Sequence, residues 1–471
     1  MEKLLSALVT MVSLAALTLA AQAPRAPLEV VAVAEDLMVP MRDGVRLATD
    51  VYRPAQGGAP IATRLPLLLH RTAYNKKGRA LVEQARALAA HGYVVAVQDD
   101  RGTYRSEGVQ SKYVGMGRDG YDAIEWLARL PYTDGQIGMW GTSYAAHTQA
   151  SAAILGPPHL KTIVLNMGGL YNGWHHKIRN HGAFELAQQL GWAFAQMAAQ
   201  ENDFIARETA RTERVAAWIA AFRARDGLGP LSTAPNFERY MFDMLTRGDY
   251  DEYWKQGDLN WSEHFAGTAD IPMLHVSGWY DAYTAGAINN FVGLAKLKRS
   301  PMRLLMGPWL HGRNEGTSAG EVGFGADAGI ADFDVAFHVR WFDHFVKGKA
   351  TGLDREPPVR LFVMGTGDGR KDAQGRLHHG GFWTSATTWP LPETRFVPHY
   401  FHEDGTLSTT LPKPGGAPTT YSYDPRSPVP TIGGSFSSQA GLVAAGAFNQ
   451  RERPFEGDPS KGFLGSRPPY L

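Results

Sequence analysis

The sequence contains no cysteine among its 471 residues. This absence excludes disulfide bonds and an N-terminal lipid-modified cysteine, so the core alone must stabilise the fold. A charge imbalance is also absent, since 47 Lys and Arg residues face 46 Asp and Glu residues. A net charge of +1 gives no reason to expect a nucleic-acid partner or a strongly acidic or basic substrate. Length and a hydrophobic content of 44% predict a large core and two or three domains.

The first 23 residues have the pattern of a secretory signal peptide. Lys3 precedes an apolar run over Leu4–Ala20, and small residues follow it. Pro24 disfavours a cut directly before it, so we expect cleavage after Ala20 or Ala21. The pattern predicts a periplasmic or secreted protein without a stable membrane anchor once the signal is removed. An uncleaved anchor is the alternative, because the apolar run is marginally long enough to span a bilayer.

Buried strands alternate with amphipathic helices through the first half of the chain. A hairpin is expected over residues 30–52, around Asp43-Gly44. Such alternation predicts a parallel sheet covered by helices, with an active site at the carboxyl ends of its strands. The expected strands are Leu65–His70, Tyr93–Gln98, Ile137–Trp140 and Thr162–Leu165, and the expected helices are Ala80–His91 and Asp119–Leu130.

A serine follows the third of these strands in the motif Gly141-Thr142-Ser143-Tyr144-Ala145. A strand-turn-helix elbow lifts a serine hydroxyl clear of the sheet and needs small neighbours, which Gly141 and Ala145 provide. The following helix N-terminus directs N–H groups towards developing negative charge. The strict motif has glycine where Ala145 stands, and a helix-capping serine is the alternative interpretation.

Two further polar residues follow strands later in the chain. Asp281 comes after a strand at Pro272–Gly278, and His311 comes after one at Leu304–Met306. The order Ser143, Asp281, His311 is that of α/β-hydrolases, which supports a catalytic triad. A helix-capping Asp281 and a packed core His311 are the alternatives.

Between these halves, residues 169–267 lose the strand–helix alternation. Helices are expected over Phe184–Met197 and Ala206–Arg225, so we interpret this insertion as a cap over the substrate cleft. His175, His176 and His181 lack the partners of a defined metal site, and we expect them to be exposed or hydrogen-bonded.

Two other segments follow strands on the same rim. The first carries Tyr74, and the second carries Asp100 next to Arg101. For Tyr74 the alternative to a catalytic role is simple packing. For the Asp100–Arg101 pair we favour a structural ion pair.

Together, these motifs resemble the cocaine esterase and X-Pro dipeptidyl-peptidase-like (CocE/NonD) group of α/β-hydrolases. The resemblance covers roughly residues 30 to 440. The segments that carry it are Val39–Val45, Tyr74, Asp100–Gly102 with Ser106 and Gly108, Gly141–Tyr144, Gly278–Asp281, Gly307–Trp309 with His311, Trp341–Asp343 and Pro357–Gly365.

The resemblance implies a role for each residue of the site. Ser143 would be the nucleophile, His311 the general base and Asp281 its orienting partner. The Tyr74 hydroxyl and the Tyr144 backbone N–H would form the oxyanion hole. The mechanism requires no metal or organic cofactor. Specificity would come from the cap and from cleft aromatics, for which Trp174 and Trp279 are the candidates.

Two departures from the group's pattern bear on activity and substrate. Ala146 stands where the group usually has glycine, which adds a methyl group beside the nucleophile turn. The start of the cap, from Trp174 to Arg179, is basic, whereas the amino-ester branch holds a substrate ammonium with acidic residues. This disfavours an amino-ester substrate and, more weakly, a free-amine dipeptide.

We expect the chain to divide into five segments, the last of which is rich in β-strands. After Pro357 the pattern becomes β-rich, with strands expected at Val359–Met364, Arg395–His402 and Thr419–Tyr423. The resemblance implies that they begin a jelly-roll domain, which we expect to be incomplete. An incomplete sandwich would expose edge strands. The segments are the signal peptide at 1–23, the hydrolase core at 24–168 and 268–350, the cap at 169–267 and the jelly-roll-like domain at 351–471.

The sequence therefore predicts a secreted serine hydrolase that cleaves a small ester or amide, or a short peptide, through an acyl-enzyme. Release of X-Pro dipeptides is the first alternative. An inactive scaffold that keeps the fold is the second, motivated by Ala146 and the short C-terminal region. The sequence leaves the acyl group, the leaving group and the oligomeric state open.

Overall fold

The computed structural model describes residues 27–200, 231, 234–423, 432–437 and 444–450. The predicted signal peptide at residues 1–23 and the predicted cap helix Ala206–Arg225 lie outside these residues. Among the helices that are described, none is long and apolar enough to cross a membrane.

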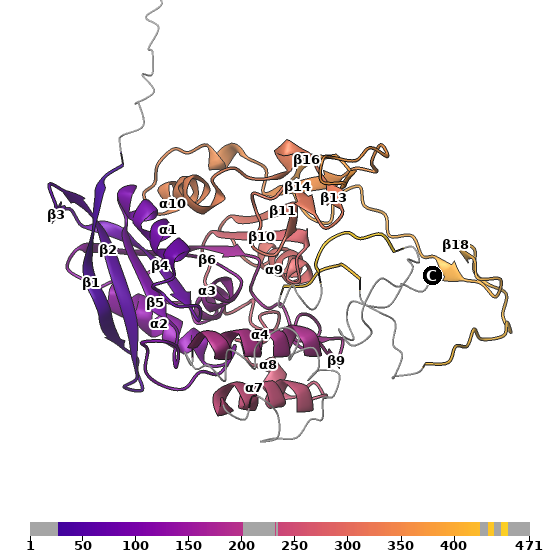
Figure 1. The fold of residues 1–471 in the computed structure, drawn as a ribbon, viewed down its shortest axis with the longest axis horizontal. Helices are drawn as coiled ribbons and strands as arrows, with labels where there is room; N and C mark the ends of the chain where they lie inside the picture. Colours follow the sequence, from indigo (N-terminus) through magenta and orange to yellow (C-terminus); the bar gives the residue numbers. More distant parts are fainter. Residues whose placement is uncertain (1–26, 201–230, 232–233, 424–431, 438–443, 451–471) are drawn as a thin grey trace, which may run out of the picture.

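A sheet of eleven strands organises the described part of the chain (Figure 1). Its order is β1-β2-β5-β4-β6-β7-β10-β11-β14-β16, and β3 pairs with β2. The strands from β5 to β14 run parallel, and antiparallel strands flank them on both sides. The strands are β1 (Glu29–Pro40), β2 (Arg46–Gln56), β3 (Ala59–Pro60), β4 (Leu65–Thr72), β5 (Val94–Asp99), β6 (Thr133–Thr142), β7 (Leu160–Asn166), β10 (Met273–Tyr280), β11 (Met302–Leu310), β14 (Val359–Met364) and β16 (Gly381–Ala386).

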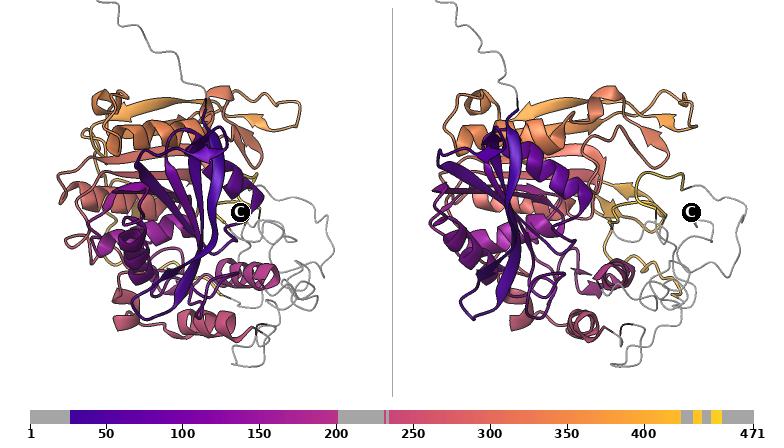
Figure 2. Two further views of the ribbon diagram at one scale, coloured as in Figure 1. Left: turned by 90° about the vertical axis from the view of Figure 1, so that its left-hand side faces the viewer. Right: turned by 60° about the vertical axis from the view of Figure 1, so that its left-hand side comes forward.

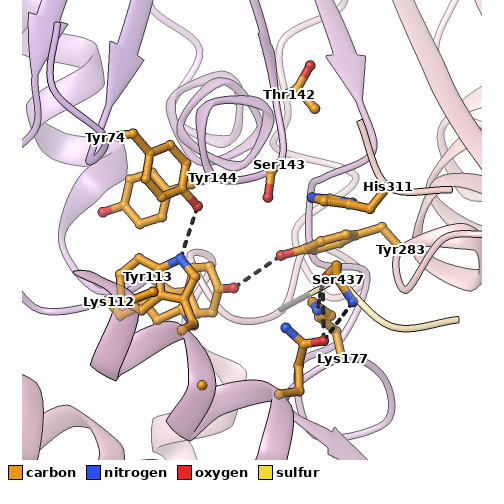
Figure 3. A pocket seen from close by; sticks show the side chains of 14 residues that line it. Tyr74, Lys112, Tyr113, Thr142, Ser143, Tyr144, Lys177, Tyr283, His311 and Ser437 are labelled. Carbon is orange, nitrogen blue, oxygen red and sulfur yellow. Dashed lines mark hydrogen bonds between the residues drawn. The ribbon is translucent and has the colours of Figure 1, made fainter. Parts of the chain in front are cut away.

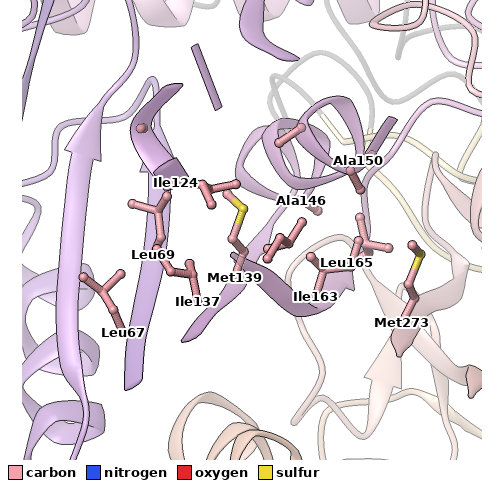
Figure 4. Packing of buried hydrophobic residues seen from close by; sticks show 14 of the residues in the cluster. Leu67, Leu69, Ile124, Ile137, Met139, Ala146, Ala150, Ile163, Leu165 and Met273 are labelled. Carbon is pink, nitrogen blue, oxygen red and sulfur yellow. The ribbon is translucent and has the colours of Figure 1, made fainter. Parts of the chain in front are cut away.

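Both faces of the parallel strands are buried, because successive side chains of a strand point to opposite faces. In β4, Leu67 and Leu69 pack into one core with Met139, whereas Leu68 packs into the other core. Figure 4 shows the first of these cores between the sheet and two helices, with Leu67, Leu69 and Met139 facing Ile124. The near-continuous apolar runs of the sequence arise from this two-sided burial.

Five helices cover the two faces of the sheet in the described residues. Helices α1 (Arg79–Ala90) and α10 (His338–Phe345) pack on one face through Leu88 and Phe342. Helices α2 (Met116–Leu127), α3 (Tyr144–Ile154) and α9 (Thr284–Ala295) pack on the other face. This arrangement is an α/β-hydrolase core, as the strand–helix alternation predicts.

The chain reverses its direction across the sheet between β4 and β6. From β4 it passes to β5 on one side, and from β5 it returns to β6 on the other side of β4. Ligands in open α/β sheets bind outside the carboxyl ends of strands at such a switch point. The segment after β4 carries Tyr74 and the segment after β6 carries Ser143.

A helical cap lies between β7 and β10. It contains β8 (Arg179–Asn180), β9 (Ala183–Phe184), α4 (Leu186–Gln200), α7 (Pro235–Thr246) and α8 (Glu252–Lys255). Helices α4 and α7 lie side by side below the sheet in Figures 1 and 2. Together with α8 they form a separate apolar cluster, to which α4 contributes Leu190 and Phe194, α7 contributes Met241 and α8 contributes Trp254. The expected helix over Phe184–Met197 corresponds to α4.

The sheet continues past residue 350, where the sequence analysis placed the start of a separate β domain. Strand β14 pairs in parallel with β11, and β16 pairs antiparallel with β14, so both belong to the central sheet. Three short strands pack beside this end: β12 (Ser318–Ala319), β13 (Val322–Gly323) and β15 (Leu377–His378). Alternation of apolar and polar residues with a period of two predicts a strand, but it does not predict which sheet the strand joins.

The strands expected further on are largely wrong. Within Arg395–His402 only β17 (Tyr400–Phe401) forms, paired with β18 (Leu407–Ser408), and Thr419–Tyr423 contains no strand. Phe396 and Phe401 are 84% and 85% exposed. β propensity reflects the packing of side chains against neighbouring strands and a buried face, and these exposed side chains have no such packing in the described structure. The described residues therefore contain no jelly roll.

Candidate active site

Ser143 lies at a strained turn between β6 and α3. Its φ and ψ angles are 63° and −119°, which non-glycine residues rarely adopt. The Ser143 N–H donates to the carbonyl of Asn166 at 2.9 Å, which ties the turn to the end of β7. The strand-turn-helix elbow inferred from the motif is thus present, with the serine at its apex.

The additional methyl group of Ala146 fits because a glycine faces it. A Cβ atom on Gly168 would lie 2.7 Å from the Ala146 Cβ and 2.3 Å from the Ser143 carbonyl oxygen. The absence of that atom leaves room for Ala146, which is fully buried. The departure at Ala146 is therefore accommodated within the turn.

Asp281 and His311 form a short hydrogen bond at the ends of neighbouring strands. The His311 Nδ1 lies 2.6 Å from the Asp281 Oδ1, and the Asp281 side chain is fully buried. Ser277 donates its hydroxyl to the other carboxylate oxygen at 2.7 Å. These bonds orient the imidazole and leave its Nε2 edge directed away from the carboxylate. In the described structure neither alternative interpretation, a helix-capping Asp281 or a core-packed His311, accounts for this pair.

The loop that carries His311 is held by contacts that the sequence motifs do not predict. Asn314 and Asn166 exchange side-chain hydrogen bonds of 2.9 and 3.1 Å. Tyr283 stacks on the His311 ring with centroids 5.7 Å apart. Asn166 is the last residue of β7 and Asn314 lies in the loop after β11, and this position at the carboxyl ends of strands is the one signal in the sequence that could have indicated them.

Ser143 and His311 line one cavity of about 470 Å³ beneath the cap (Figure 3). Figure 3 shows the His311 ring directed towards the Ser143 side chain, with Tyr74 on the other side of the serine. The aromatic wall comes from Tyr113, Trp192 and Tyr283. The described lining residues are Tyr74, Lys112, Tyr113, Thr142, Ser143, Tyr144, Lys177, Gln188, Gly191, Trp192, Ala195, Tyr283, His311 and Ser437.

Tyr74 places its hydroxyl beside Ser143. The Trp192 Nε1 donates to the Tyr74 oxygen at 3.0 Å, and the Tyr74 hydroxyl faces Ser143 across the same cavity. Desolvation raises the pKa of Tyr74, so its hydroxyl stays protonated at neutral pH. A protonated phenol can donate to an oxyanion without carrying charge itself.

Tyr144 is the first residue of α3, where backbone N–H groups lack partners within the helix. Its side chain points elsewhere, since the Tyr144 hydroxyl donates to the Asp100 Oδ2 at 2.6 Å. Only the backbone N–H of Tyr144 is therefore suited to an oxyanion.

The expected ion pair between Asp100 and Arg101 does not form. Asp100 instead pairs with the buried Arg71, and Arg101 pairs with Asp119 at 2.6 Å and Asp43 at 2.9 Å. Both residues have structural roles, but their side chains diverge because they follow a strand and point to different neighbours.

The two tryptophans expected in the pocket lie outside it. Trp174 donates its Nε1 to the Gly248 carbonyl at 2.8 Å, and Trp279 donates to the Phe362 carbonyl at 2.7 Å. Neither is among the described residues that line the cavity, so this expectation is corrected. Trp192, from α4, is the tryptophan that the cap contributes.

The histidines at the start of the cap contact one another. His175 Nδ1 lies 3.2 Å from His181 Nδ1, and the His176 ring lies 5.4 Å from that of His181. The described residues contain no group of three or more His, Asp or Glu side chains arranged to hold a metal ion.

The family model of X-Pro dipeptidyl-peptidases (S15 family) matches residues 43–313. The chain belongs to this family. Its members are serine hydrolases of the esterase or X-Pro dipeptidyl-peptidase type, and this chain is one of them. The matched range spans Ser143, Asp281 and His311.

Relatives of the family agree with this assignment. The chain is 32% identical to the cocaine esterase of a Rhodococcus species over 86% of this chain and 69% of that protein. An aminopeptidase structure from a marine sediment thaumarchaeote matches with 25% identity and a TM-score of 0.65, over 86% and 66% of the two chains. An α-amino acid ester hydrolase structure has the same fold, with a TM-score of 0.61 at 24% identity over 87% and 67%. The chain spans about two thirds of the length of each.

Proposed function

We propose that this chain hydrolyses small carboxylic esters or amides through an acyl-enzyme on Ser143. The observation that carries the proposal is the 2.6 Å bond between His311 Nδ1 and the buried Asp281, beside a strained Ser143 in one cavity. The stacked Tyr283 supports the same orientation of the imidazole.

In the proposed mechanism, His311 removes the Ser143 proton as the hydroxyl attacks the acyl carbon, and then returns it to the leaving group. Asp281 fixes the imidazole tautomer and stabilises its charged form. The Tyr74 hydroxyl and the Tyr144 N–H stabilise the oxyanion. Water then hydrolyses the acyl-enzyme by the same steps in reverse. No metal ion or organic cofactor enters these steps, so we expect full activity in EDTA, and loss of activity there would count against this site.

The test is hydrolysis of p-nitrophenyl acetate and butyrate by the purified chain and by Ser143→Ala, together with labelling by a fluorophosphonate probe. We expect labelled, active wild-type protein and an unlabelled, inactive variant. A folded wild-type protein that neither labels nor hydrolyses would support the scaffold alternative, and activity retained in Ser143→Ala would refute the assignment of the nucleophile.

Release of X-Pro dipeptides is a second candidate, because the description of the matching family names that activity. The curated relative reported above is named an esterase, which favours the first candidate. Proline dipeptide p-nitroanilides, compared with the aryl esters, separate the two. Much faster turnover of the dipeptide substrates would overturn the choice of esters and amides.

We also propose a periplasmic or secreted location, from the signal-like pattern of Met1 to Ala23. N-terminal sequencing of the exported chain tests this, with a new terminus after Ala20 or Ala21 as the expected result.

A further inference from the structure

Two buried lysines line the cavity that contains Ser143. Lys112 belongs to the loop before α2 and is 2% exposed, and Lys177 belongs to the start of the cap and is 5% exposed. Figure 3 shows both below Ser143 and His311, towards the cap helix α4. Lysine is rarely buried without a charged partner, so this pair requires an explanation.

Neutral groups surround the ammonium of Lys112. Its Nζ donates to the Gln189 Oε1 at 2.9 Å and lies 3.9 Å from the centre of the Trp192 ring. Among the described residues no carboxylate lies within 4.0 Å of it. Burial, with Lys177 nearby, lowers the pKa of Lys112 well below its usual value.

Lys177 is in a similar position on the other side of the aromatic wall. Its Nζ donates to the Ser437 hydroxyl at 2.8 Å and lies 4.7 Å from the centre of the Tyr283 ring. Glu185 and Asp281 act on it electrostatically, but in the described structure neither carboxylate approaches within 4.0 Å. Asp281 is already engaged by His311 and Ser277.

An ammonium ion that loses water without gaining a carboxylate is costly to bury. An anion in the cavity would offset that cost for both lysines, because each retains N–H donors beyond its one hydrogen bond to a neutral group. The positive charge of the two lysines also disfavours a substrate that carries a protonated amine, such as the free N-terminus of a dipeptide.

We propose that the cavity selects substrates with a carboxylate group, which Lys112 and Lys177 bind while Ser143 attacks the ester or amide carbonyl. The proposal rests on the function proposed above and defines its substrate class. The carboxylate belongs to the acyl group or to the leaving group, and these two sources are separated below.

The C-terminal segment contributes to this subsite. Ser437, which accepts a hydrogen bond from Lys177, is itself held by the cap, because its backbone N–H donates to the Gln188 Oε1 at 3.1 Å. Phe436 packs against the apolar cluster of the cap. The position of Lys177 therefore depends on a segment about 260 residues away in the sequence.

The first experiment compares esters that differ only in charge. On the acyl side, p-nitrophenyl monoadipate is compared with the p-nitrophenyl ester of adipic acid monoamide. On the leaving-group side, 4-butanoyloxybenzoate is compared with 4-butanoyloxybenzamide. One charged ester should have a kcat/KM roughly 10- to 100-fold above that of its amide partner, expressed mainly in KM. The pair that shows the preference identifies which group carries the carboxylate.

Variants then assign the preference to the lysines. Lys112→Met and Lys177→Met keep the apolar stem and remove the charge, and each should reduce the charged-to-neutral ratio of kcat/KM roughly tenfold. Lys371→Met, which removes an exposed charge that is not among the described residues lining the cavity, should leave the ratio unchanged. Because the ratio is measured within one protein, partial unfolding of a variant does not alter it.

Two measurements on the wild-type protein need no variant. Adipate should inhibit hydrolysis of p-nitrophenyl butyrate competitively, whereas adipamide should not. Burial lowers the pKa of Lys177 to about 8, with Lys112, Glu185, Asp281 and Tyr283 as its charged or titratable neighbours. The preference for the carboxylate should therefore decline as the pH rises through about 8.

Equal kcat/KM values for both charged and neutral pairs, with active turnover of p-nitrophenyl butyrate, would overturn this inference and leave the proposed hydrolase intact. No turnover of any ester by folded protein would instead refute the proposed function. A preference that survives in both lysine variants would assign the anion subsite to other residues and overturn the inference as well.

Discussion

At the scale of single residues, the site combines one pair of polar residues bonded to each other with a pair of lysines whose hydrogen-bond partners are neutral. Asp281 and His311 are hydrogen-bonded to each other, and Ser277 donates a hydrogen bond to the second carboxylate oxygen of Asp281. Lys112 and Lys177 have only neutral hydrogen-bond partners among the described residues. In the proposed function, the first pair takes part in proton transfer, and the second pair binds a ligand of opposite charge.

Tyr74 allows a prediction at this scale, since its hydroxyl lies beside Ser143. Tyr74→Phe removes one oxyanion donor and keeps the ring that contacts Tyr144 and Trp192. We expect kcat for p-nitrophenyl butyrate to fall roughly 100- to 1000-fold, about 3 to 4 kcal/mol, with little change in KM. Steady-state kinetics measure both constants.

The matched control is Tyr93→Phe, which removes a buried hydroxyl bonded to Asp343 on the α10 side of the sheet. Its kcat per folded molecule should equal that of the wild type. A Tyr74→Phe variant that retains wild-type kcat would contradict the role of the hydroxyl.

At the scale of elements, the geometry of the site depends on how closely β10 and β11 approach. Gly278 of β10 pairs with Gly307 of β11, and these strands deliver Asp281 and His311. A Cβ atom on Gly278 would lie 2.2 Å from the Trp309 carbonyl oxygen. Such a contact is with backbone, so no side-chain rotation relieves it.

Gly278→Ala should therefore separate the two strand ends and misplace His311 relative to Ser143. We expect kcat/KM for p-nitrophenyl butyrate to fall roughly 100-fold, the effect of a displacement of about 1 Å at a reacting group. Gly267→Ala is the control, because its Cβ would meet only the His264 carbonyl oxygen at 3.9 Å. Equal kcat/KM values for the two variants would show that the position of His311 does not depend on the close contact between β10 and β11.

At the scale of the whole molecule, burial of histidines makes stability depend on pH. His70, His147 and His275 have pKa values lowered to about 3, and His338 to about 4, all mainly by desolvation. In the unfolded chain each returns to about 6.5. Between about pH 3 and 6.5 the unfolded state thus binds more protons than the folded state.

The free energy of unfolding should consequently be highest above pH 6.5 and decrease as the pH falls, by up to about 1.4 kcal/mol per pH unit for each histidine. Asp99, whose pKa burial raises to about 6, binds a proton in the folded state over part of this range and offsets about one of the four histidine protons. Burial also raises the pKa values of Glu185, Asp258 and Asp334, which act in the same direction and make the net slope shallower. Urea unfolding at pH 7.5 and 5.0 measures the change. His275→Gln should reduce the slope by about one proton, and a midpoint independent of pH would contradict the prediction.

Local patterns in the sequence predicted where the residues of the candidate site lie in the fold. Ser143, Asp281 and His311 each follow a buried strand, and parallel strands bring their carboxyl ends to one edge of the sheet. The period of the apolar residues and the turn residues are local properties of the chain, so the order of these elements could be inferred before any contact was known. The fold class, the cap insertion and helix α4 followed from the same patterns.

Only the tertiary structure decided which residues surround the reacting groups. Trp192 lies in the cavity and Trp279 does not, and β14 joins the central sheet. Lys112 and Lys177 are distant in sequence, and no periodicity places them together. Their proximity depends on how the cap packs over the sheet, which is determined by contacts between segments far apart in the chain. The sequence thus determined the reaction chemistry that we propose, and packing decided the substrate charge that this chemistry would meet.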